Sequence, residues 1–145
     1  MQSNYYTISE YPTGTPSQDV FKLKQQDLPA LADGEVRIRN HWLSVDPYMR
    51  GRMSPAKSYA ASTEIGGVVT AEAICSVVES SDASLSAGDI VLARTGWQSH
   101  AVLPANACRK LDPAAAPIST ALGCLGMPGF TAYAGLMEHG KPKAG

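Results

Sequence analysis

The chain has 145 residues and a formal net charge of -1, with 12 Lys and Arg residues against 13 Asp and Glu residues. This length is that of about one domain, large enough to bury a hydrophobic core. The balanced charge gives no electrostatic basis for binding nucleic acid or an anionic membrane surface, so we expect a small ligand without strong charge.

Neither a signal peptide nor a membrane span is visible in the sequence. The first residues lack a basic start and an apolar stretch, and no apolar run approaches the roughly 20 residues of a spanning helix. A cytoplasmic protein is therefore predicted. Cys75, Cys108 and Cys124 are widely spaced, which favours reduced thiols packed as small apolar side chains over a disulfide framework or a zinc site.

Short alternating segments, separated by turn residues, occupy most of the chain. The segment 35–43 is the clearest half-buried strand, with Val36, Ile38 and Trp42 predicted on one face. Further strands are predicted at 4–11, 20–25, 66–79, 90–93 and 97–103, with loops at 54–63 and 80–87. Many short strands joined by Gly, Pro, Asp and Ser turns predict an all-β, barrel-like body.

The stretch from Trp42 to Met53 has an unusual composition. It combines a proline, a tyrosine, two methionines and two arginines, a mixture that rarely builds a core. The Asp46-Pro47 pair predicts the end of a strand, because proline offers no amide proton to a ladder and keeps the residue before it extended. Tyr48 and its neighbours are then presented at a strand end, where binding residues often lie. We expect the functional centre here.

The composition changes near residue 113. Residues 114–125 are rich in alanine and aliphatic side chains, and residues 131–139 show helical spacing before Gly140, which suits a helix C-terminus. Periodicity alone predicts a C-terminal helix packed on the barrel.

Two motifs together resemble one protein family. The sequences LSVDPYMRGRM at 43–53 and GMPGFTAY at 126–133 resemble the zinc-independent branch of the medium-chain dehydrogenase/reductases. This branch contains prostaglandin reductases, leukotriene dehydrogenases, plant double-bond reductases and bacterial curcumin-reductase-like enzymes. One departure is the segment 69–73, which reads VTAEA where relatives usually carry a glycine-rich turn.

The resemblance implies a chaperonin-10-like (GroES-like), partly open β-barrel with a few short helices. Residues 1–125 would form the catalytic, substrate-binding domain, and residues 126–145 the crossover and first helix of a Rossmann cofactor domain. The glycine-rich phosphate loop of that domain would lie beyond Gly145. We therefore expect the chain to be the N-terminal half of a longer enzyme, inactive by itself and without a metal. The oligomeric state of the full-length enzyme stays open, with a homodimer as one alternative.

The implied reaction is NADPH-dependent reduction of the C=C bond of α,β-unsaturated ketones or aldehydes by hydride transfer. The cofactor supplies the hydride, and the protein must stabilise the developing oxyanion with a hydrogen-bond donor. Tyr48 is the expected catalytic residue. The residues expected at the substrate are Tyr48 and Tyr59, and those expected at the cofactor are Pro47, Tyr48, Met49, Met127 and Thr131.

Alternative interpretations stay open at this stage. Arg50 and Arg52 either bind a phosphate or, as we favour, tie down their own loop through backbone carbonyls or carboxylates. His41 and His100 lie in strand patterns and are expected to be structural. The chain as a whole can also be a stand-alone barrel acting as a binding or assembly module, or part of a quinone oxidoreductase. The preference for NADPH over NADH rests on the resemblance alone.

Overall fold

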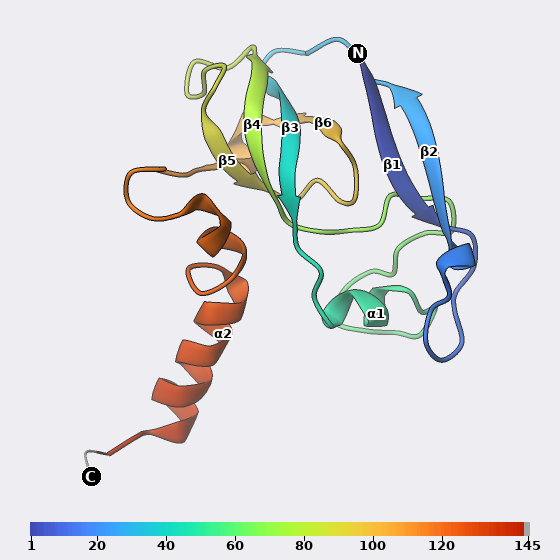
Figure 1. Cartoon of the computed structure of the whole chain (residues 1–145), viewed down its shortest axis with the longest axis vertical. Helices are drawn as coiled ribbons and strands as arrows, with labels where there is room; N and C mark the ends of the chain where they lie inside the picture. The colour runs from blue at the N-terminus through green and yellow to red at the C-terminus, as the bar shows by residue number, and fades with distance from the viewer. Residues whose placement is uncertain (144–145) are drawn as a thin grey trace.

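Two antiparallel sheets form the body of the structure, a computed structural model that describes residues 1–143 (Figure 1). The small sheet pairs β1 (Gln2–Ile8) with β2 (Phe21–Asp27). The five-stranded sheet has the order β6-β3-β4-β5-β7. Its strands are β3 (Glu35–Leu43), β4 (Ala73–Ser80), β5 (Ile90–Ala93), β6 (His100–Pro104) and β7 (Arg109–Lys110). The mainly β fold predicted from the sequence is confirmed.

The helices are short and lie between or after the strands. They are η1 (Gln18–Val20), α1 (Tyr48–Arg52), η2 (Ala105–Ala107), η3 (Ile118–Leu122), α2 (Met127–Ala134) and the π-helical η4 (Gly135–Gly140). None of the helices within residues 1–143 combines the length and the apolar composition needed to cross a membrane.

Two clusters of buried side chains form the core. One lies against the five-stranded sheet and includes Val36, Ile38 and Val91, all fully buried. The other joins Ile8 of β1 to Met53, directly after α1, and also contains Val20 and Val69. Because this second cluster spans both regions, it fixes α1 relative to the small sheet.

The strand at 35–43 is confirmed, but the burial predicted for Trp42 is wrong. Val36 and Ile38 are fully buried, whereas Trp42 is 46% exposed. The pairing of β3 with β4 shifts register between Asn40 and Trp42. An irregularity of this kind inserts an extra residue and changes the face on which the following side chains lie.

Four other predicted strands begin or end elsewhere, and one of them, β2, spans Phe21–Asp27 instead of 20–25. β1 ends at Ile8 instead of residue 11, and β6 begins at His100 instead of residue 97. β4 begins only at Ala73, because the preceding glycines form a turn in which Gly66 has φ +82 and donates its N–H to the carbonyl of Ile8. A positive φ of this size favours glycine and interrupts an extended segment.

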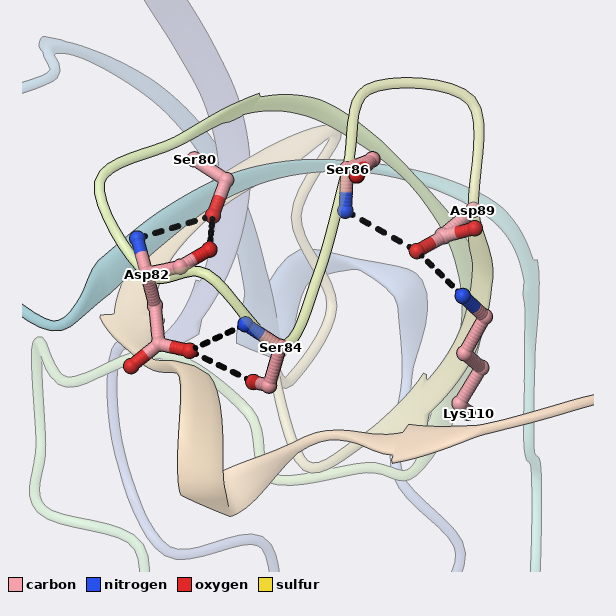
Figure 2. Close-up of polar contacts among 6 residues, drawn as sticks. All are labelled: Ser80, Asp82, Ser84, Ser86, Asp89 and Lys110. Atoms are coloured by element: carbon pink, nitrogen blue, oxygen red, sulfur yellow. Dashed lines mark hydrogen bonds and ion pairs between the residues drawn. The ribbon is translucent and has the colours of Figure 1, made fainter.

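The connection from β4 to β5 is held by two aspartates (Figure 2). Asp82 accepts hydrogen bonds from the backbone and hydroxyl of Ser84, and Asp89 accepts them from the backbone of Ser86 and the ammonium of Lys110. These donors lower the pKa of both carboxyls below the usual value. The Asp89–Lys110 ion pair, at 2.7 Å, also joins this turn to the edge strand β7.

The prediction that the C-terminal helix packs on the barrel is wrong. Figure 1 shows α2 and η4 extending away from the sheets, and neither contains a buried residue. Phe130 is 71% exposed and Tyr133 is 62% exposed. The helix ends at Gly140 as predicted, although Lys141 is the residue in the left-handed conformation.

The helix leaves the body through a tight turn. A Cβ atom on Gly126 would overlap the backbone carbonyl of Ala121, and one on Gly129 would overlap that of Cys124. Only glycine therefore fits at these two positions. The thiol of Cys124 is free and its residue is exposed, so this cysteine does not fill the core as predicted.

Candidate functional site

The helix α1 follows β3 directly and is anchored at both ends. Pro47, with φ -55, precedes its first residue, and the fixed φ of proline suits a helix start. Ser44, the first residue after β3, exchanges hydrogen bonds with the backbone of Glu72. Met49 and Met53 are only 3% and 4% exposed, so they hold α1 on the core. Tyr48 remains half-buried on the outer side.

Two arginines tie this segment to neighbouring loops. Arg50 donates from Nη2 to the carbonyls of Pro12 and Gly14, at 2.7 and 2.9 Å. Arg52 donates from Nη1 to the carbonyl of Ala61 at 2.7 Å. The expectation that these arginines hold their loop through backbone carbonyls is confirmed.

A pocket of about 150 Å³ opens beside α1. Its lining residues are Tyr48, Arg52, Tyr59, Glu72, Arg94 and Met127. The guanidinium carbon of Arg52 lies 5.8 Å from the ring centroid of Tyr48 and 5.7 Å from that of Tyr59. These distances are within the range of cation–π attraction, so Arg52 connects the helix to the exposed loop that carries Tyr59. Three predicted site residues, Tyr48, Tyr59 and Met127, therefore meet in one pocket.

The other predicted cofactor residues do not line this pocket. Met49 is buried in the interior, and Pro47 is exposed next to the pocket. The hydroxyl of Thr131 donates to the carbonyl of Met127 at 2.8 Å, within the same helix. Cofactor contacts of these three residues stay predictions.

The hydroxyl of Tyr48 is held in its protonated form. Burial raises its pKa, and so do the carboxylates of Asp46 and Glu72. The guanidiniums of Arg94 and Arg52 act in the opposite direction, but the pKa remains above the usual value. Near neutral pH, the hydroxyl of Tyr48 is therefore protonated, and Tyr48 brings a hydrogen-bond donor to the residues that line the pocket.

Sequence reasoning missed two pocket residues, Glu72 and Arg94. Arg94 follows β5, and its Nη2 lies 3.7 Å from Oε1 of Glu72. Glu72 belongs to the segment 69–73, where this chain departs from the family pattern. That departure was the sequence feature that could have indicated Glu72. No sequence feature indicates Arg94, which reaches the pocket only through the tertiary fold.

The two strand histidines lie elsewhere. His41 shares a hydrogen bond with Ser76, and His100 shares one with Ser99. Neither lines the pocket beside α1. Among residues 1–143, no cluster of three or more His, Cys, Asp or Glu side chains is arranged to hold a metal ion.

The sequence of this chain is similar to those of known oxidoreductases. A family described as the N-terminal domain of oxidoreductase matches residues 4–111. The NADPH-dependent curcumin reductase of Escherichia coli (strain K12) is 41% identical over 140 residues, which cover 97% of this chain and 41% of the relative. Prostaglandin reductase 1 of Rattus norvegicus is 38% identical over 141 residues, which cover 95% of this chain and 41% of the relative.

A solved structure also matches this chain in three dimensions. CurA from Vibrio vulnificus in complex with NADPH matches with a TM-score of 0.91 and 43% identity, over 98% of this chain and 42% of that chain. The chain thus spans about two fifths of the length of the relatives it matches.

Proposed function

This chain belongs to the family of oxidoreductase N-terminal domains, with the GroES-like fold of the zinc-independent medium-chain dehydrogenase/reductases, and on that premise we propose that it is the substrate-side part of an NADPH-dependent double-bond reductase. The proposed reaction is reduction of the C=C bond of α,β-unsaturated ketones or aldehydes. The names of the relatives support it: curcumin reductase, prostaglandin reductase 1 and, in Nicotiana tabacum, 2-alkenal reductase (NADP(+)-dependent).

The observation that carries the proposal is the position of Tyr48 at the pocket, where its hydroxyl can donate a hydrogen bond to a ligand. Reduction of a conjugated alkene places negative charge on the carbonyl oxygen, and a fixed donor in a water-poor site stabilises that charge. Tyr48 is a suitable donor because it is anchored on α1 by Met49 and Met53. Tyr59, on the loop held by Arg52, would line the substrate side.

The residues of this chain fit one side of a nicotinamide. Tyr48 and Met127 offer an aromatic and a thioether surface in the same pocket, suited to a flat heterocycle. NADPH supplies a hydride when bound. Within this chain, Pro47, Met49 and Thr131 are the further proposed neighbours of the cofactor.

We also propose that residues 1–125 form the substrate domain and that residues 126–145 begin a cofactor domain. The exposed apolar side chains of α2 and η4 support this division, since a helix with such a surface normally packs against another element. Phe130, Tyr133 and Leu136 are each more than half exposed.

The test is turnover by the protein expressed from its reading frame extended beyond residue 145. NADPH oxidation is followed with 4-phenylbut-3-en-2-one, with a simple quinone, and with no acceptor. Enone reduction supports the proposal, whereas turnover of the quinone alone assigns a quinone reductase. If the reading frame encodes no cofactor domain and neither acceptor is reduced, the result favours the alternative interpretation, a stand-alone binding module.

In the same enzyme, Tyr48→Phe is expected to lower kcat by a factor on the order of 10 to 1,000, because it removes one oxyanion donor and keeps the ring. Tyr5→Phe, in β1 and outside the pocket, is the matched control. An unchanged rate in Tyr48→Phe would assign Tyr48 a packing role.

A further inference from the structure

The guanidinium of Arg52 contacts aromatic rings from two different segments. Its central carbon lies 5.8 Å from the ring centroid of Tyr48, in α1, and 5.7 Å from that of Tyr59, in the loop 54–63. Its Nη1 donates to the carbonyl of Ala61 at 2.7 Å, whereas its buried Nε has no hydrogen-bond partner among the described residues. The two rings are therefore a large part of what holds this guanidinium in place.

The loop that carries Tyr59 has little structure of its own. Residues 54–63 contain neither helix nor strand, and Tyr59 is 85% exposed. The end of the loop is fixed, because the amide of Thr63 donates to the carbonyl of Arg52 at 2.8 Å. The ring of Tyr59 lies away from this end, and none of the ring–ring contacts within the part of the chain that the structure describes includes it. The orientation of this ring therefore depends on the side chain of Arg52.

Arg52 can transmit the rigidity of α1 to this loop. It is the last residue of α1, directly before the buried Met53, so its backbone is fixed on the core. A planar guanidinium can contact a ring with its face while its edge donates hydrogen bonds, and Arg52 uses both kinds of contact on the loop, at Tyr59 and at Ala61. The same side chain thus connects Tyr59 to Tyr48, and both tyrosines line one pocket.

We propose that Arg52 is a positioning residue that orders Tyr59 at the pocket, so that this ring packs against the part of the substrate beyond the enone. The inference rests on the proposed function and deepens it: Tyr48 acts on the carbonyl, whereas Arg52 acts through Tyr59 on the substituent. A phenyl substituent offers a tyrosine ring far more apolar surface than a methyl group does. Binding of a phenyl-substituted enone should therefore depend on Arg52 more strongly than binding of a methyl-substituted one.

The test uses two substrates that differ in this substituent. They are 4-phenylbut-3-en-2-one and pent-3-en-2-one, which carries a methyl group in place of the phenyl ring, reduced by the enzyme expressed from the extended reading frame. The measured quantity is the phenyl-to-methyl ratio of kcat/KM, in which effects common to both substrates cancel. We expect Tyr59→Ala to lower this ratio about fivefold, the range of one aromatic pair, and Arg52→Gln to lower it by about the same factor. The loss should appear as a higher KM for the phenyl substrate.

The double variant Arg52→Gln/Tyr59→Ala distinguishes positioning from an independent contact. If Arg52 acts through Tyr59, the double variant lowers the phenyl-to-methyl ratio no further than Tyr59→Ala alone. A fall of about 25-fold, the product of the two single effects, would show that the two residues act independently, and it overturns the inference. An unchanged ratio in Arg52→Gln overturns it as well.

The matched control is Arg109→Gln, which removes the same charge from the exposed strand β7, outside this pocket. It should leave the phenyl-to-methyl ratio unchanged. A fall in this control equal to that in Arg52→Gln would assign the effect to the lost charge alone, and the inference is then overturned.

Failure of the inference can be separated from failure of the proposed function. Turnover of both enones without an Arg52-dependent ratio removes the inference and keeps the reductase. If neither enone is reduced, the proposed function fails, and NMR of the 145-residue chain decides whether Arg52 positions Tyr59. Arg52→Gln should move the ring signals of Tyr59 toward those of a free tyrosine and lower the heteronuclear NOE of its amide.

The milder variant Arg52→Lys is measured in the same way if Arg52→Gln does not fold. It keeps a cation near the rings but lacks the planar guanidinium, so a smaller change in the same direction is expected. Unchanged Tyr59 signals in the folded variant overturn the inference.

Discussion

Replacing Arg50 by alanine tests whether this arginine is a structural clamp. Its guanidinium donates three hydrogen bonds to the carbonyls of Pro12 and Gly14, at 2.7, 2.9 and 3.2 Å. A hydrogen bond from a charged donor contributes about 1.5–3 kcal/mol, and these bonds share one side chain, so we expect Arg50→Ala to lower the free energy of unfolding by about 2–3 kcal/mol. The melting temperature should fall by roughly 5–10 °C.

The assay is urea unfolding of the 145-residue chain, followed by circular dichroism and tryptophan fluorescence. Arg50→Lys keeps the charge without the planar fork and should recover less than half of the loss. Arg39→Ala is the matched control, because Arg39 is exposed and makes no ion pair among residues 1–143; its effect should stay within about 0.5 kcal/mol. If Arg50→Ala unfolds like the parent chain, the clamp interpretation is refuted. Phosphate binding then becomes the favoured role of Arg50.

Two further predictions concern thiols and acid. Burial raises the pKa of the Cys75 thiol to about 12, so iodoacetamide at pH 8 should modify the exposed Cys124 in the folded chain and leave Cys75 unmodified until denaturant is added; equal labelling of both would contradict the fold. The pKa values of Asp82 and Asp89 are lower in the folded chain than the unfolded value of about 3.9, so their carboxylates stabilise the fold above that pH. This stabilisation is lost as the pH falls through the folded pKa values. Urea midpoints should therefore drop between pH 5 and pH 2, and the double variant Asp82→Asn/Asp89→Asn should flatten that drop; an equally steep drop in the variant would exclude these carboxyls as its source.

The strands were largely predictable because alternation is a local property. Residues 35–43 and 90–93 were predicted with their observed bounds, since each is a regular run between clear turns. Trp42 was misplaced because a register shift depends on the partner strand, which the pattern of one strand does not contain. The exposed C-terminal helix was misplaced for a similar reason: its apolar spacing indicates that it needs a partner, not where that partner lies.

The candidate site was predicted in part. The Asp46-Pro47 strand end located Tyr48, and the resemblance added Tyr59 and Met127, which the structure brings into the same pocket. Glu72 and Arg94 come from two other segments that meet only when β4 and β5 pair. Because Glu72 and Arg94 come together only in the folded chain, no local sequence pattern predicts that both charges lie in the pocket.

Five of the six residues lining the pocket belong to the body of the domain, and the sixth, Met127, stands at the base of the exposed C-terminal helix. That helix leaves the body at Gly126, where no larger residue fits. The angle of the helix therefore determines how far Met127 reaches across toward Tyr48, and with it the width of the opening. A movement of this helix about Gly126 would therefore change the width of the pocket, while Tyr48, Arg52, Tyr59, Glu72 and Arg94 stay in place.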